Sequence, residues 1–163
     1  MTGVIYEERL FSRWSTLFLA VATVAMLWQM IRQLQAGAVA DVPPWFFAAM
    51  FILFLALTIN FSWLTIRITD ERIVVGYGVM RERVGWQEIV DCYHDGASAF
   101  WYGGWGIRMG WYKGKFRLIY NAIGGPRVVL LRRNSRFPEL VFSTKHPEAV
   151  ISAVRQHLKT LAR

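Results

Sequence analysis

Residues 44–69 read PWFFAAMFILFLALTINFSWLTIRIT, and this stretch decides the fold. Its first twenty-three residues, 44–66, carry no charge, and Phe, Leu, Ile, Ala and Met dominate them. A helix that rises about 1.5 Å per residue crosses the roughly 30 Å hydrocarbon core of a bilayer in about twenty residues. The last six residues, LTIRIT, alternate apolar and polar with the period of a β-strand. The stretch therefore predicts a membrane helix that passes into a strand with essentially no linker.

A second uncharged run, of eighteen residues, lies upstream at Trp14–Ile31. Both runs have tryptophan near each end, at positions 14 and 28 and at positions 45 and 63. Tryptophan favours the headgroup level of a bilayer, so this placement is typical of an aromatic belt. We expect residues 1–66 to form an N-terminal tail and two transmembrane helices, at about 14–31 and 44–66.

Two alternatives exist for the first run. A pair of buried core helices in a soluble protein would need far more covering chain than the 97 residues that follow. A signal peptide could be cleaved at the small-x-small triplet Ala38-Val39-Ala40, although Arg32 and two glutamines separate that triplet from the apolar run. The second run would hold the chain in the membrane whether or not such a signal peptide is cleaved.

The arginines that flank the two runs predict their orientation. Arg9 and Arg13 precede the first run, whereas the connection between the runs carries Arg32 alone. Four arginines follow the second run, at positions 67, 72, 81 and 83. Because short cytoplasmic segments carry the excess of Lys and Arg, we expect a hairpin with both termini cytoplasmic.

Composition narrows the function classes. The chain has 163 residues, of which 55% are hydrophobic and 18% are charged. Soluble domains average about 45–50% apolar and about 25% charged residues. The single cysteine excludes an intramolecular disulfide framework and a multi-cysteine zinc site. The net charge of +8 lies entirely in residues 67–163, because charges cancel in residues 1–66. An anionic partner of the C-terminal part must therefore be considered.

Residues 67–163 are long enough for one small domain. Short alternating runs bounded by turn residues predict about seven strands. The period then changes to that of a helix at about 147–161, which starts with Pro147 and carries an apolar stripe at positions 150, 151, 154, 158 and 161. Such a helix buries its stripe best against the open end of a curved antiparallel sheet.

Four segments in this domain, taken in order, resemble a bacterial pleckstrin-homology-like (PH-like) domain protein with an N-terminal two-helix membrane anchor. They are ITDERIVV at 68–75, VGWQEI at 84–89, GGWGIR at 103–108 and FSTKHPE at 142–148. The resemblance implies a PH-like antiparallel curved sheet or barrel closed by the C-terminal helix. It also implies a multi-pass protein of the bacterial cell inner membrane, with no enzymatic activity and no settled ligand.

The residues give little support for catalysis. The chain lacks the common hydrolase, P-loop, zincin and dinucleotide-binding motifs. Cys92 and His94 lie two apart, but a metal site needs further ligands from elsewhere in the chain. We therefore expect no catalytic residue, no cofactor and no metal.

The segment from Gly96 to Lys115 is rich in aromatic and basic residues, a mixture typical of a membrane interface. Nucleic-acid binding uses the same residue types, but the adjacent membrane helices favour lipid, and we expect no nucleic acid. The candidate membrane or partner contacts are Trp101, Tyr102, Arg108, Trp111, Tyr112, Lys113, Lys115, Arg132 and Arg133. The alternative for the last two is a solvated strand end.

In the second apolar run, Asn60 is a candidate intramembrane polar contact, with the first helix or with another subunit as its partner. It could equally reach water at the membrane edge. Taken together, the sequence favours a non-enzymatic, membrane-anchored interaction module that contacts anionic lipid headgroups or a protein partner. The alternative is an accessory or oligomeric scaffold subunit of a membrane protein complex.

Overall fold

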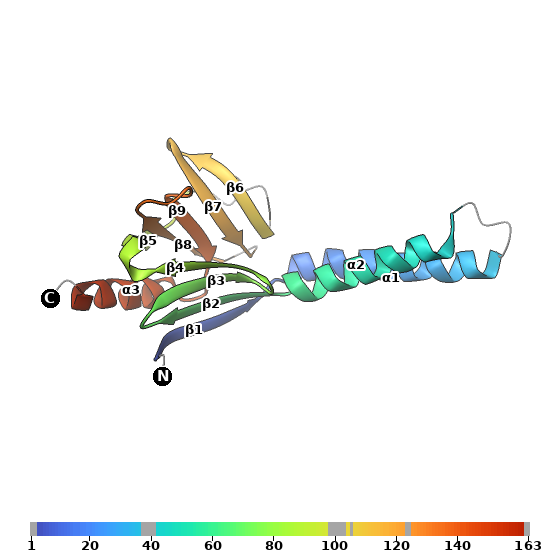
Figure 1. The fold of residues 1–163 in the computed structure, drawn as a ribbon, viewed down its shortest axis with the longest axis horizontal. Coiled ribbons are helices and arrows are strands. Elements are labelled where there is room, and N and C mark those ends of the chain that lie inside the picture. Colours follow the sequence, from blue (N-terminus) through green and yellow to red (C-terminus); the bar gives the residue numbers. More distant parts are fainter. Residues whose placement is uncertain (1–2, 37–41, 98–103, 105, 123–124, 162–163) are drawn as a thin grey trace.

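The computed structural model describes residues 3–36, 42–97, 104, 106–122 and 125–161. It has two parts, a long helical hairpin and a β domain that ends in a helix (Figure 1). The hairpin is inserted between the first and second strands of the β domain.

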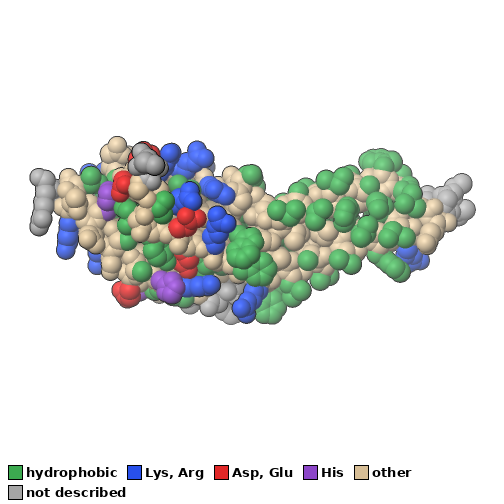
Figure 2. Space-filling model, turned by 90° about the horizontal axis from the view of Figure 1, so that it is seen from below, with side chains coloured by type: hydrophobic (Ala, Val, Ile, Leu, Met, Phe, Trp, Pro, Cys, Tyr) green, Lys and Arg blue, Asp and Glu red, His purple; other side chains and the backbone are tan. Residues whose placement is uncertain are grey.

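The hairpin consists of α1, Arg13–Ala36, packed against α2, Pro44–Phe61. The two helices are about 36 Å and 27 Å long, and both are long and apolar enough to cross a membrane. Core helices of soluble proteins are mostly buried, whereas 11% of the apolar span of α1 and none of that of α2 is buried. Hydrophobic side chains cover the hairpin, and charged side chains gather over the β domain (Figure 2).

The N-terminal segment forms a strand rather than a simple tail. β1, Val4–Phe11, pairs antiparallel with β2, Trp63–Thr69, from Phe11 opposite Trp63 to Val4 opposite Thr69. This pairing explains why α2 ends at Phe61, earlier than the expected residue 66. The sequence of β1 does not alternate cleanly, and only Leu10 of the strand is buried in the core, so its strand signal is weak.

The β domain contains two sheets among the described residues. The first has the strand order β1-β2-β3-β4, and the second has the order β5-β8-β9-β7-β6. Their further strands are β3 (Arg72–Tyr77), β4 (Met80–Gly85), β5 (Ile89–His94), β6 (Gly106–Tyr112), β7 (Lys115–Asn121), β8 (Arg127–Arg132) and β9 (Glu139–Ser143). The expected sheet was wholly antiparallel, but β7 and β9 pair parallel.

The core lies between the two sheets and is closed by α3, Pro147–Leu161. This helix packs against β5, β8 and β1, as its apolar stripe predicts. A 3-10 turn at Trp86–Glu88 connects the sheets. There the indole N–H of Trp86 donates to the carbonyl oxygen of Thr69 (2.9 Å), and its ring stacks on His157 of α3 with centroids 4.1 Å apart. One side chain thus joins the first sheet to the closing helix.

Hydroxyl groups join the hairpin to the first sheet. The backbone N–H of Ser12 donates to the carbonyl oxygen of Ser62 (2.8 Å), and the hydroxyl of Thr16 donates to that of Ser62 (3.2 Å). Further along the helices, the hydroxyl oxygens of Thr23 and Thr58 lie 3.2 Å apart. Ser12 lies in the connection from β1 to α1, and Ser62 lies in the connection from α2 to β2. Bonds between these two connections hold the domain and the hairpin as one body.

Asn60 forms a second junction. Its Oδ1 accepts a hydrogen bond from the backbone N–H of Val79 (2.9 Å), in the turn between β3 and β4. The preceding Gly78 has φ +44°, and a Cβ there would collide with Oδ1 of Asn60. Only glycine suits both the left-handed backbone and the close approach. The β3–β4 turn is therefore docked on the end of α2.

This docking gives a first prediction. Gly78→Ala should lower the free energy of unfolding by about 2 kcal/mol or more, because it adds backbone strain and a collision with Asn60. Gly96→Ala is the matched control, since a Cβ at Gly96 meets nothing within 4 Å and its φ is not left-handed. Thermal unfolding of the detergent-solubilised chain, followed by near-ultraviolet circular dichroism, measures both. Equal stability of the two variants would contradict the prediction.

Candidate functional site

Every second residue of the first sheet points away from the core, because side chains alternate along a strand. The strand register places these outward residues in rows across the sheet. The row closer to the hairpin is Arg9, Thr65, Gly76 and Arg81. The next row is Glu7, Arg67, Val74 and Arg83. Arginine thus stands at or near both edges of the sheet.

Seven of these eight residues, all except Gly76, line a groove of about 600 Å³ on the outer face of the first sheet. The end of α2 and the start of β2 form its base, with Ile59, Asn60 and Trp63. Five arginines and two glutamates line it, so its formal net charge is +3. We call it the arginine groove, after Arg9, Arg67, Arg72, Arg81 and Arg83.

The positive charge of the arginine groove is unevenly compensated. Glu7 forms a close ion pair with Arg67 (2.9 Å) and a longer one with Arg9 (3.7 Å). On β4, Arg81 and Arg83 are exposed, and among the described residues neither has a carboxylate within ion-pair distance. The uncompensated charge therefore concentrates along the β4 side.

Apolar side chains form the rim of the groove beside the hairpin. The rings of Phe11 and Trp63 lie 5.0 Å apart by centroid, and both are about half exposed. Val79, at the β3–β4 turn, is 89% exposed. Exposed aromatic and aliphatic residues next to the end of a membrane helix are typical of the interfacial level.

Gly76 is buried in the sheet beside the groove and does not line it. It lies between Thr65 and Arg81 in the row closer to the hairpin. A Cβ at Gly76 would collide with the backbone carbonyl of Met80, so the strand is held close to its neighbour there.

Sequence reasoning used these arginines only to orient the membrane helices. Polar residues recur at every second position at Thr65, Arg67 and Thr69, and again at Arg81 and Arg83. This spacing was a signal that one face of the sheet is polar. Arg9 could not have been added to that face, because β1 was not predicted.

The described members of the predicted aromatic and basic set do not assemble beside the hairpin. Trp101 and Tyr102 lie outside the described residues. Arg108 and Trp111 are exposed on β6, and Tyr112 ends that strand. Trp111 stacks on Phe116, with ring centroids 5.1 Å apart.

Lys113 and Lys115 lie at the turn between β6 and β7. This turn is at the end of the second sheet away from the helical hairpin (Figure 1). The ammonium group of Lys115 also forms an ion pair with the buried Glu139 (3.1 Å). The predicted lysine pair therefore does not lie beside the hairpin.

Arg132 was expected to contact the membrane or a partner, but the structure buries it. Its side chain is 1% exposed and pairs with Glu82 (2.6 Å), and its Nη2 donates to the carbonyl oxygen of Phe137 (2.7 Å). Alternation along β8 turns it inward, so it bridges the two sheets and is not available for a membrane contact. Its neighbour Arg133 is exposed, in the loop after β8. Asn60, expected to bond within the membrane, instead bonds the β3–β4 turn.

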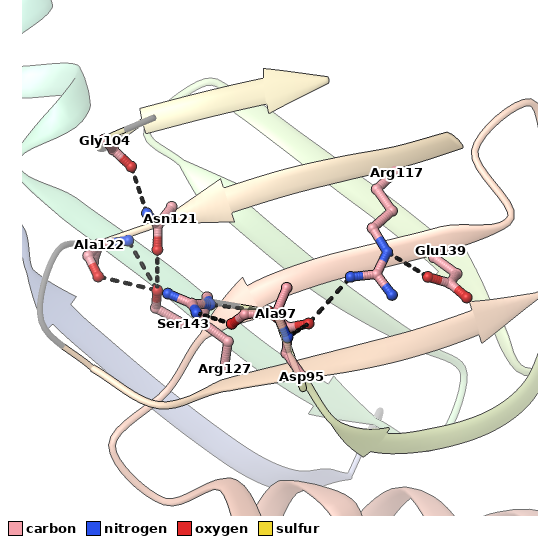
Figure 3. Close-up of polar contacts among 9 residues, drawn as sticks. All are labelled: Asp95, Ala97, Gly104, Arg117, Asn121, Ala122, Arg127, Glu139 and Ser143. Atoms are coloured by element: carbon pink, nitrogen blue, oxygen red, sulfur yellow. Dashed lines mark hydrogen bonds and ion pairs between the residues drawn. The ribbon is translucent and has the colours of Figure 1, made fainter. Parts of the chain in front are cut away.

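A buried polar cluster covers the outer face of the second sheet (Figure 3). Arg117 on β7 pairs with Asp95 (3.1 Å) and with Glu139 on β9 (2.5 Å), and Arg127 on β8 also pairs with Asp95 (3.0 Å). Arg127 further donates to the carbonyl oxygen of Ala97 (2.8 Å). The cluster fastens the chain after β5 onto the sheet, which is a structural role.

Glu139 is ionised in this cluster. Burial alone would raise the pKa of its carboxyl group, but hydrogen bonds from Lys115 and Tyr93 and the charge of Arg117 outweigh burial. The pKa of Glu139 is therefore lowered from its ordinary value. A carboxylate with a lowered pKa stabilises the folded state above its unfolded pKa, and this contribution is lost as the pH falls through the folded pKa.

The thiol of Cys92 is unsuited to nucleophilic chemistry. Cys92 is fully buried in the core, and burial together with the nearby Asp91 charge raises its pKa to about 12. The adjacent His94 instead contacts Glu148 at the start of α3 (2.7 Å). In the described part of the chain, no group of three or more His, Cys, Asp or Glu side chains is placed to hold a metal ion.

Comparisons with protein-family models, with curated proteins and with solved structures find no match to this chain.

The buried cluster gives a second prediction. Glu139→Gln should destabilise the protein by about 3 kcal/mol near neutral pH, because it removes one carboxylate from a buried arginine. The difference from the wild type should shrink as the pH falls from about 4.5, the ordinary pKa of a glutamate, through the lower pKa of Glu139 in the folded protein. Denaturant unfolding across this pH range measures the effect. Glu148→Gln, at an exposed pair, is the control and should change little.

Cys92 gives a third prediction. A maleimide should fail to label the native chain at neutral pH and should label it fully after unfolding in denaturant. Mass spectrometry of the intact chain counts the added label. Rapid labelling of the native chain would contradict the burial of this thiol.

Proposed function

We propose that this chain is a non-enzymatic, membrane-anchored interaction module. Its helical hairpin crosses the bilayer, and its β domain lies against one membrane surface, where it contacts anionic headgroups. The observation that carries the proposal is the arginine groove, whose base is the end of α2 itself. A basic surface is thus built directly onto a membrane-spanning element.

The strand pairing supports a hairpin topology. β1 and β2 are antiparallel neighbours that flank the two helices, so the N-terminal strand and the β domain lie on the same side of the membrane. The arginine bias predicts that this side is the cytoplasm, which suits the inner membrane of a bacterial cell.

Electrostatics favours an anionic surface as the contact. An anionic leaflet attracts each nearby Lys or Arg by about 1 kcal/mol, within a Debye length of about 8–10 Å. The arginine groove starts at the end of α2 and carries a formal net charge of +3. The row of residues closer to the hairpin therefore lies inside this range. The charge therefore adds to the anchoring and fixes which face of the domain meets the headgroups.

The fold is consistent with the PH-like resemblance in outline, since two sheets enclose a core that a C-terminal helix closes. Two features depart from the expected pattern, the added strand β1 and the parallel pair β7–β9. We keep the PH-like assignment as part of the proposal.

One observation favours the alternative, a scaffold subunit in a membrane protein complex. β6 is one of the two edge strands of the second sheet, and its Met109 and Trp111 are 64% and 69% exposed. An exposed edge with large apolar side chains suits pairing with another protein or a second copy.

Topology is tested with single cysteines, since the native Cys92 is buried. In proteoliposomes, cysteines introduced as Gln35→Cys at the far end of α1 and as Ser152→Cys on α3 should react with a membrane-impermeant maleimide from opposite sides. Labelling of both from the same side would contradict a membrane-crossing hairpin.

Surface binding is tested with the full chain in nanodiscs, because β1 belongs to the domain and an isolated 67–163 fragment would lack it. Discs with about one-third phosphatidylglycerol should raise the unfolding midpoint of the domain by about 3–6 °C over phosphatidylcholine discs at low salt. High salt should remove the gain. The same midpoint in both discs at low salt would refute the proposed function.

A further inference from the structure

We propose that the arginine groove holds the headgroup phosphate of a single anionic phospholipid. The phosphate lies between Arg9 on β1 and Arg81 and Arg83 on β4, and the acyl chains stay in the bilayer beside the end of α2. This inference rests on the proposed function and deepens it, because it replaces a diffuse charge attraction with one built site.

The register of the sheet brings the three arginines around one space. Arg9 and Arg81 end the row that passes through Thr65 and Gly76. Adjacent strands are about 4.8 Å apart, so β1 and β4 lie about 14 Å apart across two strands. Arg9 and Arg81 both line the same groove, with Thr65 between them, and Arg83 lies two residues further along β4.

The chemistry of these side chains matches a phosphate ester. Guanidinium groups bind phosphate oxygens through paired N–H donors, and such charge-assisted bonds are stronger than neutral ones. The hydroxyl of Thr65 adds a further donor on the floor. Arg81 and Arg83 have no acidic partner in the described part of the chain, so an anion placed there meets uncompensated charge.

The base of the groove favours a lipid over a soluble phosphate ester. Ile59, which is 68% exposed, and Trp63, which is 50% exposed, both line it. Ile59 lies in the last turn of α2 and Trp63 is the first residue of β2, so the groove opens toward the bilayer. A phospholipid can then keep its chains in the hydrocarbon while its headgroup enters the groove.

The size of the groove suits one headgroup. Sites for small molecules occupy about 300–1,000 Å³, and the groove measures about 600 Å³. The docking of Gly78 and Val79 on Asn60 fixes the β3–β4 turn, and with it the position of Arg81 relative to α2. The site is therefore preorganised next to the membrane.

The test counts lipids retained by the full chain. The detergent-solubilised protein is mixed with equal amounts of phosphatidylglycerol and phosphatidylcholine, and native mass spectrometry reports the bound species. We expect one phosphatidylglycerol per chain. Arg81→Gln with Arg83→Gln should reduce its retention by about tenfold or more.

Two further variants make the test specific. Because Arg81 also donates to the carbonyl oxygen of Gly78, Arg9→Gln with Arg83→Gln provides a second groove variant that leaves this bond intact. Lys113→Gln with Arg133→Gln is the matched control, because it removes two exposed cations outside the groove. Circular dichroism confirms that each variant is folded.

The outcomes separate this inference from the proposed function. Loss of lipid in the groove variants alone supports the site, whereas equal loss in the control overturns it in favour of diffuse attraction. Displacement of the lipid by glycerophosphoglycerol at equal concentration would instead assign a soluble phosphate ester. Absence of retained lipid, together with a stabilising effect of anionic nanodiscs, overturns the site but leaves the proposed function standing. Absence of both effects refutes both.

Discussion

The pairing of β1 with β2 is the constraint on which the rest of the structure depends. These strands leave the two ends of the helical hairpin and are hydrogen-bonded to each other from Phe11 opposite Trp63 onward. The backbone bond from Ser12 to Ser62 closes the hairpin at the same level. The helices therefore do not hang from a flexible linker, because the sheet continues the path of both.

This junction gives the outer face of the first sheet its setting. The rows of arginine start just beyond Phe11 and Trp63, so the basic surface begins where the apolar surface ends. The second sheet uses several of its charged residues internally, as in the cluster of Arg117, Asp95 and Glu139.

The sequence predicted the elements with strong periodic signals. Long uncharged runs identified both helices, and the apolar stripe after Pro147 identified α3. β1 was not predicted because its pairing partner lies beyond the hairpin and its own apolar and polar residues do not alternate cleanly. For a related reason, composition drew attention to Lys113 and Lys115 and not to the arginines of the first sheet. An arginine face becomes visible only when strand register is known, and burial of Arg132 depends on contacts between the sheets that no local pattern contains.

The insertion of the hairpin between paired strands has a consequence for biogenesis. β1 is synthesised before the two helices, but its partner β2 is made only after both of them. Until the two helices pack together, the edge of β2 is open and the core lacks Leu10. Completion of the first sheet therefore reports that the hairpin is in place. A chain whose helices have not packed together carries an unpaired strand edge, and such an edge is prone to pair with another chain and aggregate.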